Sequence, residues 1–190
     1  MVEIIVLIVF FLLLALVLVI VSRAIIKKET IIGRPPIPVF YFILAKFLVL
    51  VNLVFLLLRG LDAGVDRLFI RVVYVDLFAL ALLISGTIIL FLSTVQLNKD
   101  LVFGLSSSVD HKLQTKGIYS FSRHPFYLGF LFILFASCLL TPHIINIIAF
   151  LGAWIIHHFI MIKEEEFLAS QYGDEYRQYA ENVNRYLTLK

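Results

Sequence analysis

Two polar clusters in this sequence carry side chains that can hold charged ligands, and an apolar stretch separates them. The first lies in residues 117–129, GIYSFSRHPFYLG, and centres on Arg123 and His124. The second is the three-glutamate run at 164–166. Between them, residues 124–162 contain no Asp, Glu, Lys or Arg. If this stretch folds back on itself, both clusters return to one end of the fold, and a guanidinium can face carboxylates.

The first cluster suits an anion. Arg123 offers a planar fork of N–H donors that binds a carboxylate or phosphate through two hydrogen bonds. Pro125 is favoured at the first position of a helix, which predicts His124 as the N-cap and leaves first-turn N–H groups available to an anion. The ordinary alternative is that Arg123 and His124 anchor the helix end to lipid headgroups.

The second cluster suits a cation or a hydroxyl group. Carboxylates are disfavoured at the C-terminus of a helix, so the run at 164–166 indicates a binding role unless the helix continues through it. At helical spacing His157 and Glu164 share one face, and His158 and Glu165 share the adjacent face. These four side chains are also potential metal ligands, but no metal-binding motif occurs, and we predict no metal site.

Composition predicts a membrane protein. Of the 190 residues 62% are hydrophobic and 15% are charged, against about 25% charged in soluble domains. As one helix, residues 124–162 would measure about 58 Å, which exceeds a hydrocarbon core of about 30 Å. Pro142 near the midpoint predicts a tight turn between two helices. We therefore predict an all-α fold with five membrane spans, the last two forming a helical hairpin, at about 3–22, 39–58, 73–95, 125–140 and 144–162.

The basic residues predict an orientation. With five spans, twelve of the sixteen Lys and Arg residues flank one side and three flank the other. The positive-inside rule then places the N-terminus outside, and the C-terminus and the polar clusters in the cytoplasm. Lys46 lies within the second span, where it either snorkels to a headgroup or serves a function. No basic stretch is interleaved with stacking aromatic residues, so we predict no nucleic-acid partner. The single Cys138 predicts a buried thiol.

The two clusters together resemble a known family. The pattern RHPxYxG followed by a pair of glutamates resembles the isoprenylcysteine carboxyl methyltransferase family and the related phospholipid methyltransferases. The resemblance covers about 80 residues, from His111 to the end of the chain. The matching residues are Arg123, His124, Pro125, Tyr127, Gly129, Glu164 and Glu165.

The resemblance implies a single integral membrane domain over 1–190, whose part at 111–187 binds S-adenosylmethionine. It implies methylation of a carboxylate on a lipid-like or prenylated substrate, among membrane lipids. Arg123 would orient that carboxylate, and Arg123 and Glu165 are the implied catalytic residues. The implied cofactor-binding residues are His111, Leu113, Tyr119, His124, Pro125, Tyr127, Glu164 and Glu165.

Three other functions remain open at this point. A phospholipid N-methyltransferase would use the same cofactor, but its amine acceptor must lose a proton, so His124 or a glutamate would act as a base. A membrane reductase would bind NADPH, whose 2′-phosphate calls for further basic residues that 124–162 does not supply. A lipid-binding or scaffold module without activity would tolerate the loss of Arg123 and Glu165.

Overall fold

The computed structural model describes residues 1–27, 33–64, 72–97 and 113–188. Regular structure within these ranges is helical, which confirms the predicted all-α class. The elements are α1 Val2–Lys27, α2 Val39–Gly60, α3 Val73–Leu97, the 3-10 helix η2 Gly117–Ser120, α4 Pro125–Leu140, α5 Ile144–Tyr172 and α6 Asp174–Asn182. The predicted site residue His111 lies outside the described residues.

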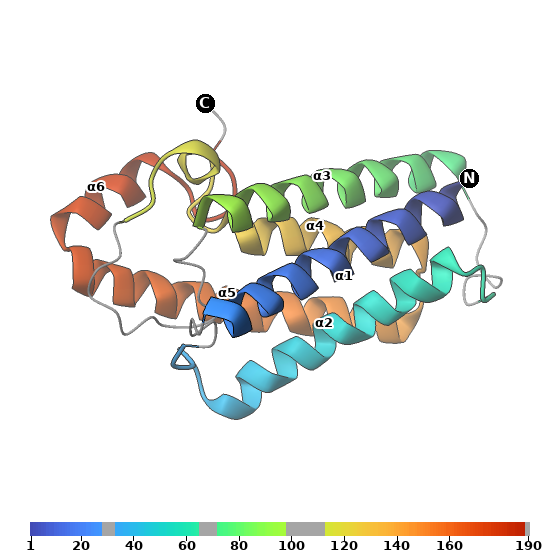
Figure 1. Ribbon diagram of the computed structural model, residues 1–190, viewed down its shortest axis with the longest axis horizontal. Coiled ribbons are helices and arrows are strands. Elements are labelled where there is room, and N and C mark those ends of the chain that lie inside the picture. The colour runs from blue at the N-terminus through green and yellow to red at the C-terminus, as the bar shows by residue number, and fades with distance from the viewer. Residues whose placement is uncertain (28–32, 65–71, 98–112, 189–190) are drawn as a thin grey trace.

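Helices α1 to α5 run lengthwise as an up-and-down bundle, and α6 lies beyond its end (Figure 1). Helix α3 packs along α4, and α2 packs along α5. The N-terminus lies at one end of the bundle, and η2, α6 and the C-terminal residues lie at the other. The buried core between the helices is aliphatic and includes Leu56, Leu83, Leu90, Ile133 and Leu140.

The outer surface of the bundle is apolar, as a lipid environment requires. Large hydrophobic side chains stand exposed along the helices, among them Phe11, Phe47, Phe91 and Phe159. Four helices, α1, α2, α3 and α5, are long and apolar enough to cross a membrane, whereas α4 has 16 residues and a length of about 24 Å. The protein is an integral membrane protein, and its fifth crossing through α4 stays a prediction.

The predicted hairpin forms between α4 and α5, and buried polar side chains fix it. Helix α4 ends at Leu140 and α5 begins at Ile144, so the turn falls at the predicted proline. The Asn146 amide donates to the carbonyl oxygens of Ser137 and Thr141 at 3.1 and 3.0 Å. The Ser137 hydroxyl donates to the Asn52 carbonyl of α2 at 2.9 Å. These bonds hold α4 and α5 in one register, which sets where the opposite ends of the two helices meet.

Helix α5 is longer than the membrane span predicted within it. It continues ten residues past the predicted end at residue 162 and stops at Tyr172, where Gly173 has a φ of 55°. Glycine adopts this left-handed conformation without steric cost, which allows the chain to turn into α6. The glutamates at 164–166 therefore lie inside a helix, and the helix-end argument against a merely solvated role does not apply to them.

Two glycines allow α3 and α4 to pack with their backbones in contact. A Cβ built on Gly129 would lie 2.8 Å from the Gly86 carbonyl oxygen and 2.9 Å from the Leu90 nitrogen. A Cβ on Gly86 would lie 2.8 Å from the Gly129 carbonyl oxygen. The two glycines therefore allow a close approach of α3 and α4, and Gly129 of the RHPxYxG pattern serves helix packing.

We expect Gly129→Ala to destabilise the protein by about 1–3 kcal/mol, because the added methyl group must displace the α3 backbone. The measurement is the melting temperature in detergent. Gly152→Ala is the matched control, since its Cβ would meet only the flexible end of Leu48 and it gains the same helix propensity. Equal melting temperatures for the two variants would show that α3 and α4 are not in backbone contact.

Candidate functional site

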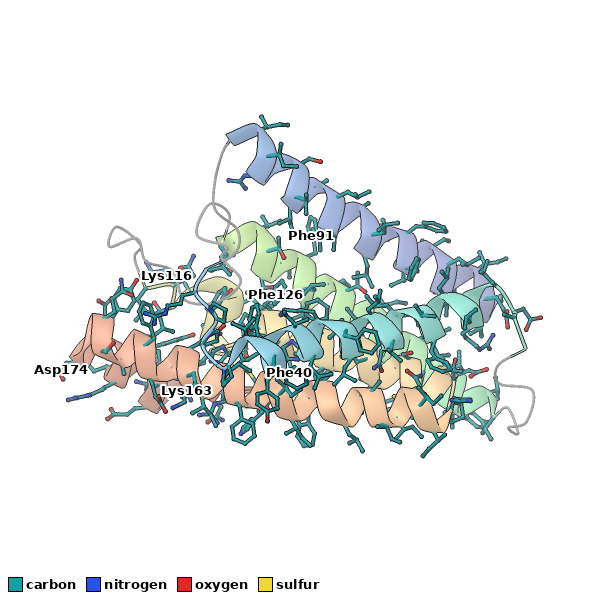
Figure 2. The ribbon with its side chains drawn as sticks, turned by 90° about the horizontal axis from the view of Figure 1, so that it is seen from below. Phe40, Phe91, Lys116, Phe126, Lys163 and Asp174 are labelled. Carbon is teal, nitrogen blue, oxygen red and sulfur yellow. The ribbon has the colours of Figure 1, made fainter. Side chains whose placement is uncertain are left out.

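The polar clusters meet at the end of the bundle where α4 begins and α5 extends beyond the apolar stretch. Figure 2 shows Lys116, Lys163 and Asp174 toward this end of the molecule. Pro125 occupies the first turn of α4 and His124 is its N-cap, as predicted. The His124 backbone N–H donates to the Ser122 hydroxyl at 3.1 Å, and the side chain is only 6% exposed. The helix start thus holds an imidazole inside the site.

Glu165 is the centre of the ion-pair network. Arg123 contacts both of its carboxylate oxygens through Nη2 at 3.0 Å and one of them through Nε at 3.3 Å. Arg185 contacts the same two oxygens through Nε and Nη2, each at 2.8 Å. The Nε2 atom of His124 lies 3.1 Å from Oε1. One carboxylate therefore binds two guanidinium groups and an imidazole.

Arg123 is fully engaged within the protein. Besides its three hydrogen bonds to Glu165, its Nη1 donates to the carbonyl oxygens of Ala180 and Val183, both at 2.9 Å. All three guanidinium nitrogens of Arg123 therefore have partners, and Nη1 is occupied by two main-chain carbonyls. In this arrangement Arg123 joins the start of α4 to α5 and to the end of α6.

The C-terminal residues pass over the start of α4. The Arg123 N–H donates to the Asn184 carbonyl at 3.0 Å, and the Thr188 N–H donates to the Phe121 carbonyl at 2.8 Å. These main-chain bonds place Arg185 beside α5. The segment 183–188, which we call the tail, is therefore part of the site.

Glu164 has a different environment from its neighbour. The Tyr127 hydroxyl donates to it at 2.7 Å, and His124 Nδ1 lies 3.7 Å from its second oxygen. Its side chain is 17% exposed, and no guanidinium contacts it in the described part of the chain. The Tyr127 ring also lies 5.6 Å from the ring of His157. Glu164 is thus an enclosed carboxylate that retains acceptor capacity for a ligand.

The Glu165 carboxylate, which Arg123 and Arg185 share, affects the pKa values of the side chains near the tail. The hydrogen bonds to Glu165 raise the pKa of Arg185, so it stays charged. Burial, followed by the charge of Glu165, raises the pKa of Tyr176 to about 12, so its hydroxyl keeps its proton. That hydroxyl is buried and has no hydrogen-bond partner among residues 1–27, 33–64, 72–97 and 113–188. A donor left unpaired at this depth is costly, and a polar ligand group can satisfy it.

The structure brings most of the predicted site residues together. Arg123, His124, Tyr127, Glu164 and Glu165 form one contact network, and Pro125 starts α4, the helix that carries Tyr127. Tyr119 is buried in η2, where its carbonyl accepts from the Tyr179 hydroxyl at 2.6 Å. Leu113 is half-buried just before η2.

Sequence reasoning missed Arg185 as a site residue and treated it only as part of the topology signal. Its pairing with Glu165 spans 20 residues that include a turn and a short helix, so no periodic spacing reveals it. The available signal was charge balance, since a buried carboxylate needs nearby cations.

The bundle and its network define an integral membrane protein with a charged site at one end of a helical hairpin. The chain belongs to the phospholipid methyltransferase family, whose model matches residues 75–175, more than half of the sequence. This finding confirms the resemblance drawn from the RHPxYxG and glutamate patterns.

Relatives with curated names are methyltransferases. The chain is 33% identical over 111 residues to methanethiol S-methyltransferase 1 of Bradyrhizobium diazoefficiens, which covers 53% of this chain and 38% of that protein. It is 36% identical over 75 residues to protein-S-isoprenylcysteine O-methyltransferase of Schizosaccharomyces pombe, covering 39% and 32% of the respective chains. It is 31% identical over 114 residues to the probable protein-S-isoprenylcysteine O-methyltransferase of Oryza sativa subsp. indica, covering 58% and 60%. The matched part is less than two thirds of each of these proteins.

Proposed function

We propose that this protein transfers a methyl group from S-adenosylmethionine to a carboxylate of a lipid-like or prenylated acceptor at the membrane interface. The observation that carries the proposal is the unequal pair of adjacent carboxylates. Glu165 is saturated by Arg123, Arg185 and His124, whereas Glu164 accepts a hydrogen bond only from Tyr127 in the described part of the chain. A saturated carboxylate organises the site, and its neighbour is available to a ligand.

The residues present fit this cofactor. An enclosed carboxylate such as Glu164 favours an ammonium, sulfonium or hydroxyl group, and the unpaired Tyr176 hydroxyl calls for a polar ligand atom. His124 and Tyr127 hold Glu164 in place from one turn of α4. When bound, S-adenosylmethionine supplies a methyl group on sulfur, which an acceptor atom takes while the bonding electron pair stays on the sulfur.

A carboxylate acceptor needs no general base from the protein. Its ordinary pKa of about 4 leaves it ionised and nucleophilic at pH 7. The protein must then align the acceptor and limit the access of water, and alignment is a large contribution in such a displacement. His124 and Tyr176 are 6% and 4% exposed, so the site is already shielded on the side of α4 and α6.

The proposed placement in the membrane puts the site at the cytoplasmic face and the N-terminus outside. The distribution of Lys and Arg supports this orientation, and so does the arrangement of the bundle, whose site and N-terminus lie at opposite ends (Figure 1). The exposed apolar sides of α2 and α5 would let an acceptor tail remain in lipid while its head reaches the site.

The test is a transfer assay with purified protein and S-adenosylmethionine labelled with tritium in the methyl group. Three acceptors share a farnesyl tail and carry a carboxylate, a primary amine or a thiol. We expect base-labile tritium on the carboxylate acceptor, as a methyl ester releases labelled methanol. Label on the amine instead would assign N-methylation, and label on none of the three acceptors would contradict the proposal.

A further inference from the structure

Arg185 holds Glu165 with only one edge of its guanidinium. Its Nε and Nη2 each donate to a Glu165 oxygen at 2.8 Å. Of the five N–H donors of an arginine, the two on Nη1 and the second on Nη2 have no partner among the residues that the structure describes. These donors form the end-on edge of the guanidinium, which has the spacing to bind a second carboxylate or a phosphate through two bonds.

The comparison with Arg123 shows that this edge is particular to Arg185. The Arg123 side chain is 13% exposed and its Nη1 is occupied by the Ala180 and Val183 carbonyls, which blocks its end-on edge, whereas the Arg185 side chain is 28% exposed. Both pair with the same carboxylate, so Glu165 compensates only one of the two positive charges. Glu164, the other carboxylate, is the group that a cationic cofactor would neutralise. One positive charge then remains for an anion, on the more exposed arginine.

The tail places this charge next to a lipid-facing part of α5. The ring of Tyr186 stacks on His158 with centroids 5.9 Å apart, and the two side chains lie 2.7 Å apart at Oη and Nδ1. Trp154 donates to the same hydroxyl at 3.3 Å. Trp154 is 42% exposed and Phe159 is 56% exposed. An amphiphile with its head at Arg185 can therefore lay its apolar chain along this surface.

We infer that Arg185 binds the anionic head of the acceptor and so selects carboxylates over neutral and cationic groups. This inference rests on the proposed function, because it concerns the acceptor of the same reaction. It moves the role first predicted for Arg123 to Arg185, and it leaves Arg123 as the residue that positions Glu165 and the tail. A protonated amine head would meet the same guanidinium with repulsion.

The experiment measures the selectivity of binding. The probes are N-acetyl-S-farnesyl-L-cysteine and its carboxamide, which differ only in the charge of the head group. Each is titrated into detergent-solubilised protein saturated with S-adenosylhomocysteine. We expect the wild type to bind the carboxylate at least tenfold more tightly than the carboxamide, and we expect Arg185→Gln to reduce this ratio to nearly one. Arg177→Gln, an exposed arginine of α6 paired with Asp174, is the charge-matched control and should keep the ratio.

A second variant covers the case in which Arg185→Gln disturbs the tail. Arg185→Lys keeps a positive charge for Glu165 but lacks the fork that can hold two carboxylates, so the ratio should fall at least threefold with the melting temperature unchanged. Equal binding of the two probes by the wild type, binding of neither, or a ratio that survives both substitutions would overturn the inference. Wild-type protein that fails to bind S-adenosylhomocysteine would contradict the proposed function instead, so the two failures are distinguishable.

Discussion

Glu165→Gln is expected to lower the stability of the protein by about 3 kcal/mol, because it leaves Arg123 and Arg185 in a largely enclosed site without their shared counter-charge. In a chain of this size that loss corresponds to a fall in melting temperature of about 6–12 °C. The tail should also detach, since Arg185 loses its side-chain partner. Circular dichroism in detergent gives the melting temperature, and limited proteolysis reports the exposure of the tail.

The matched control for this prediction is the next residue along the helix. Glu166 is 58% exposed and pairs with Lys163 on the surface, so Glu166→Gln should change stability by less than about 0.5 kcal/mol. The double variant Arg185→Gln, Glu165→Gln should be less destabilised than the sum of the single changes, because it removes both members of one pair. Equal melting temperatures for Glu165→Gln and Glu166→Gln would show that the network does not hold the site together.

Glu164→Gln is expected to weaken the binding of S-adenosylmethionine at least tenfold, or about 1.4 kcal/mol, while it leaves the fold intact. The glutamine keeps an oxygen for the Tyr127 hydroxyl, which donates to the glutamate at 2.7 Å, but it removes the negative charge that a cationic cofactor requires. Equilibrium dialysis with labelled cofactor measures the affinity, and the melting temperature without cofactor verifies the fold.

Tyr127→Phe distinguishes the effect of the Glu164 charge on cofactor binding from the effect of the orientation of that carboxylate. It keeps the Glu164 carboxylate and removes the hydroxyl that holds it, so we expect a smaller loss of affinity than for Glu164→Gln. Unchanged affinity in Glu164→Gln, measured in protein of normal melting temperature, would reassign the cofactor to another part of the structure.

Much of the fold could be predicted because helices that cross a membrane need long apolar stretches, which are easy to recognise in the sequence. Charge-free stretches define the long helices, and the position of Pro142 defines the hairpin between α4 and α5. The hairpin in turn brings Arg123 to Glu165, 42 residues away, at 3.0 Å. The helix start at Pro125 with His124 as N-cap followed from the local preference of proline.

The features that could not be predicted arise from contacts between residues that have no regular spacing in the sequence. The tail binds across the start of α4 through main-chain bonds such as that from Arg123 to Asn184, which any residue type can form. The Ala180 and Val183 carbonyls accept from Nη1 of Arg123, and no side-chain pattern indicates contacts to main-chain carbonyls so far along the chain. The unequal environments of Glu164 and Glu165 arise in the same way.

A buried ion-pair cluster at the other end of the bundle was also not predicted. Arg59, at the end of the second span, entered the sequence analysis only through the count of basic residues that flank the spans. In the structure it is 1% exposed, and it contacts Glu3 at 2.7 Å and Asp76 at 3.7 Å, which joins α1, α2 and α3 at the end opposite the site. Each of these residues is ordinary at a helix end, and only the bundle shows that the three ends coincide.

The measurement that tests the central claim most directly is a calorimetric titration of the wild-type protein in detergent with S-adenosylmethionine. The account predicts saturable binding at one site per chain, with competition by S-adenosylhomocysteine. Protein that unfolds cooperatively at its normal melting temperature but takes up neither compound would contradict it, because the carboxylates of α5 would then serve some purpose other than holding a methyl donor.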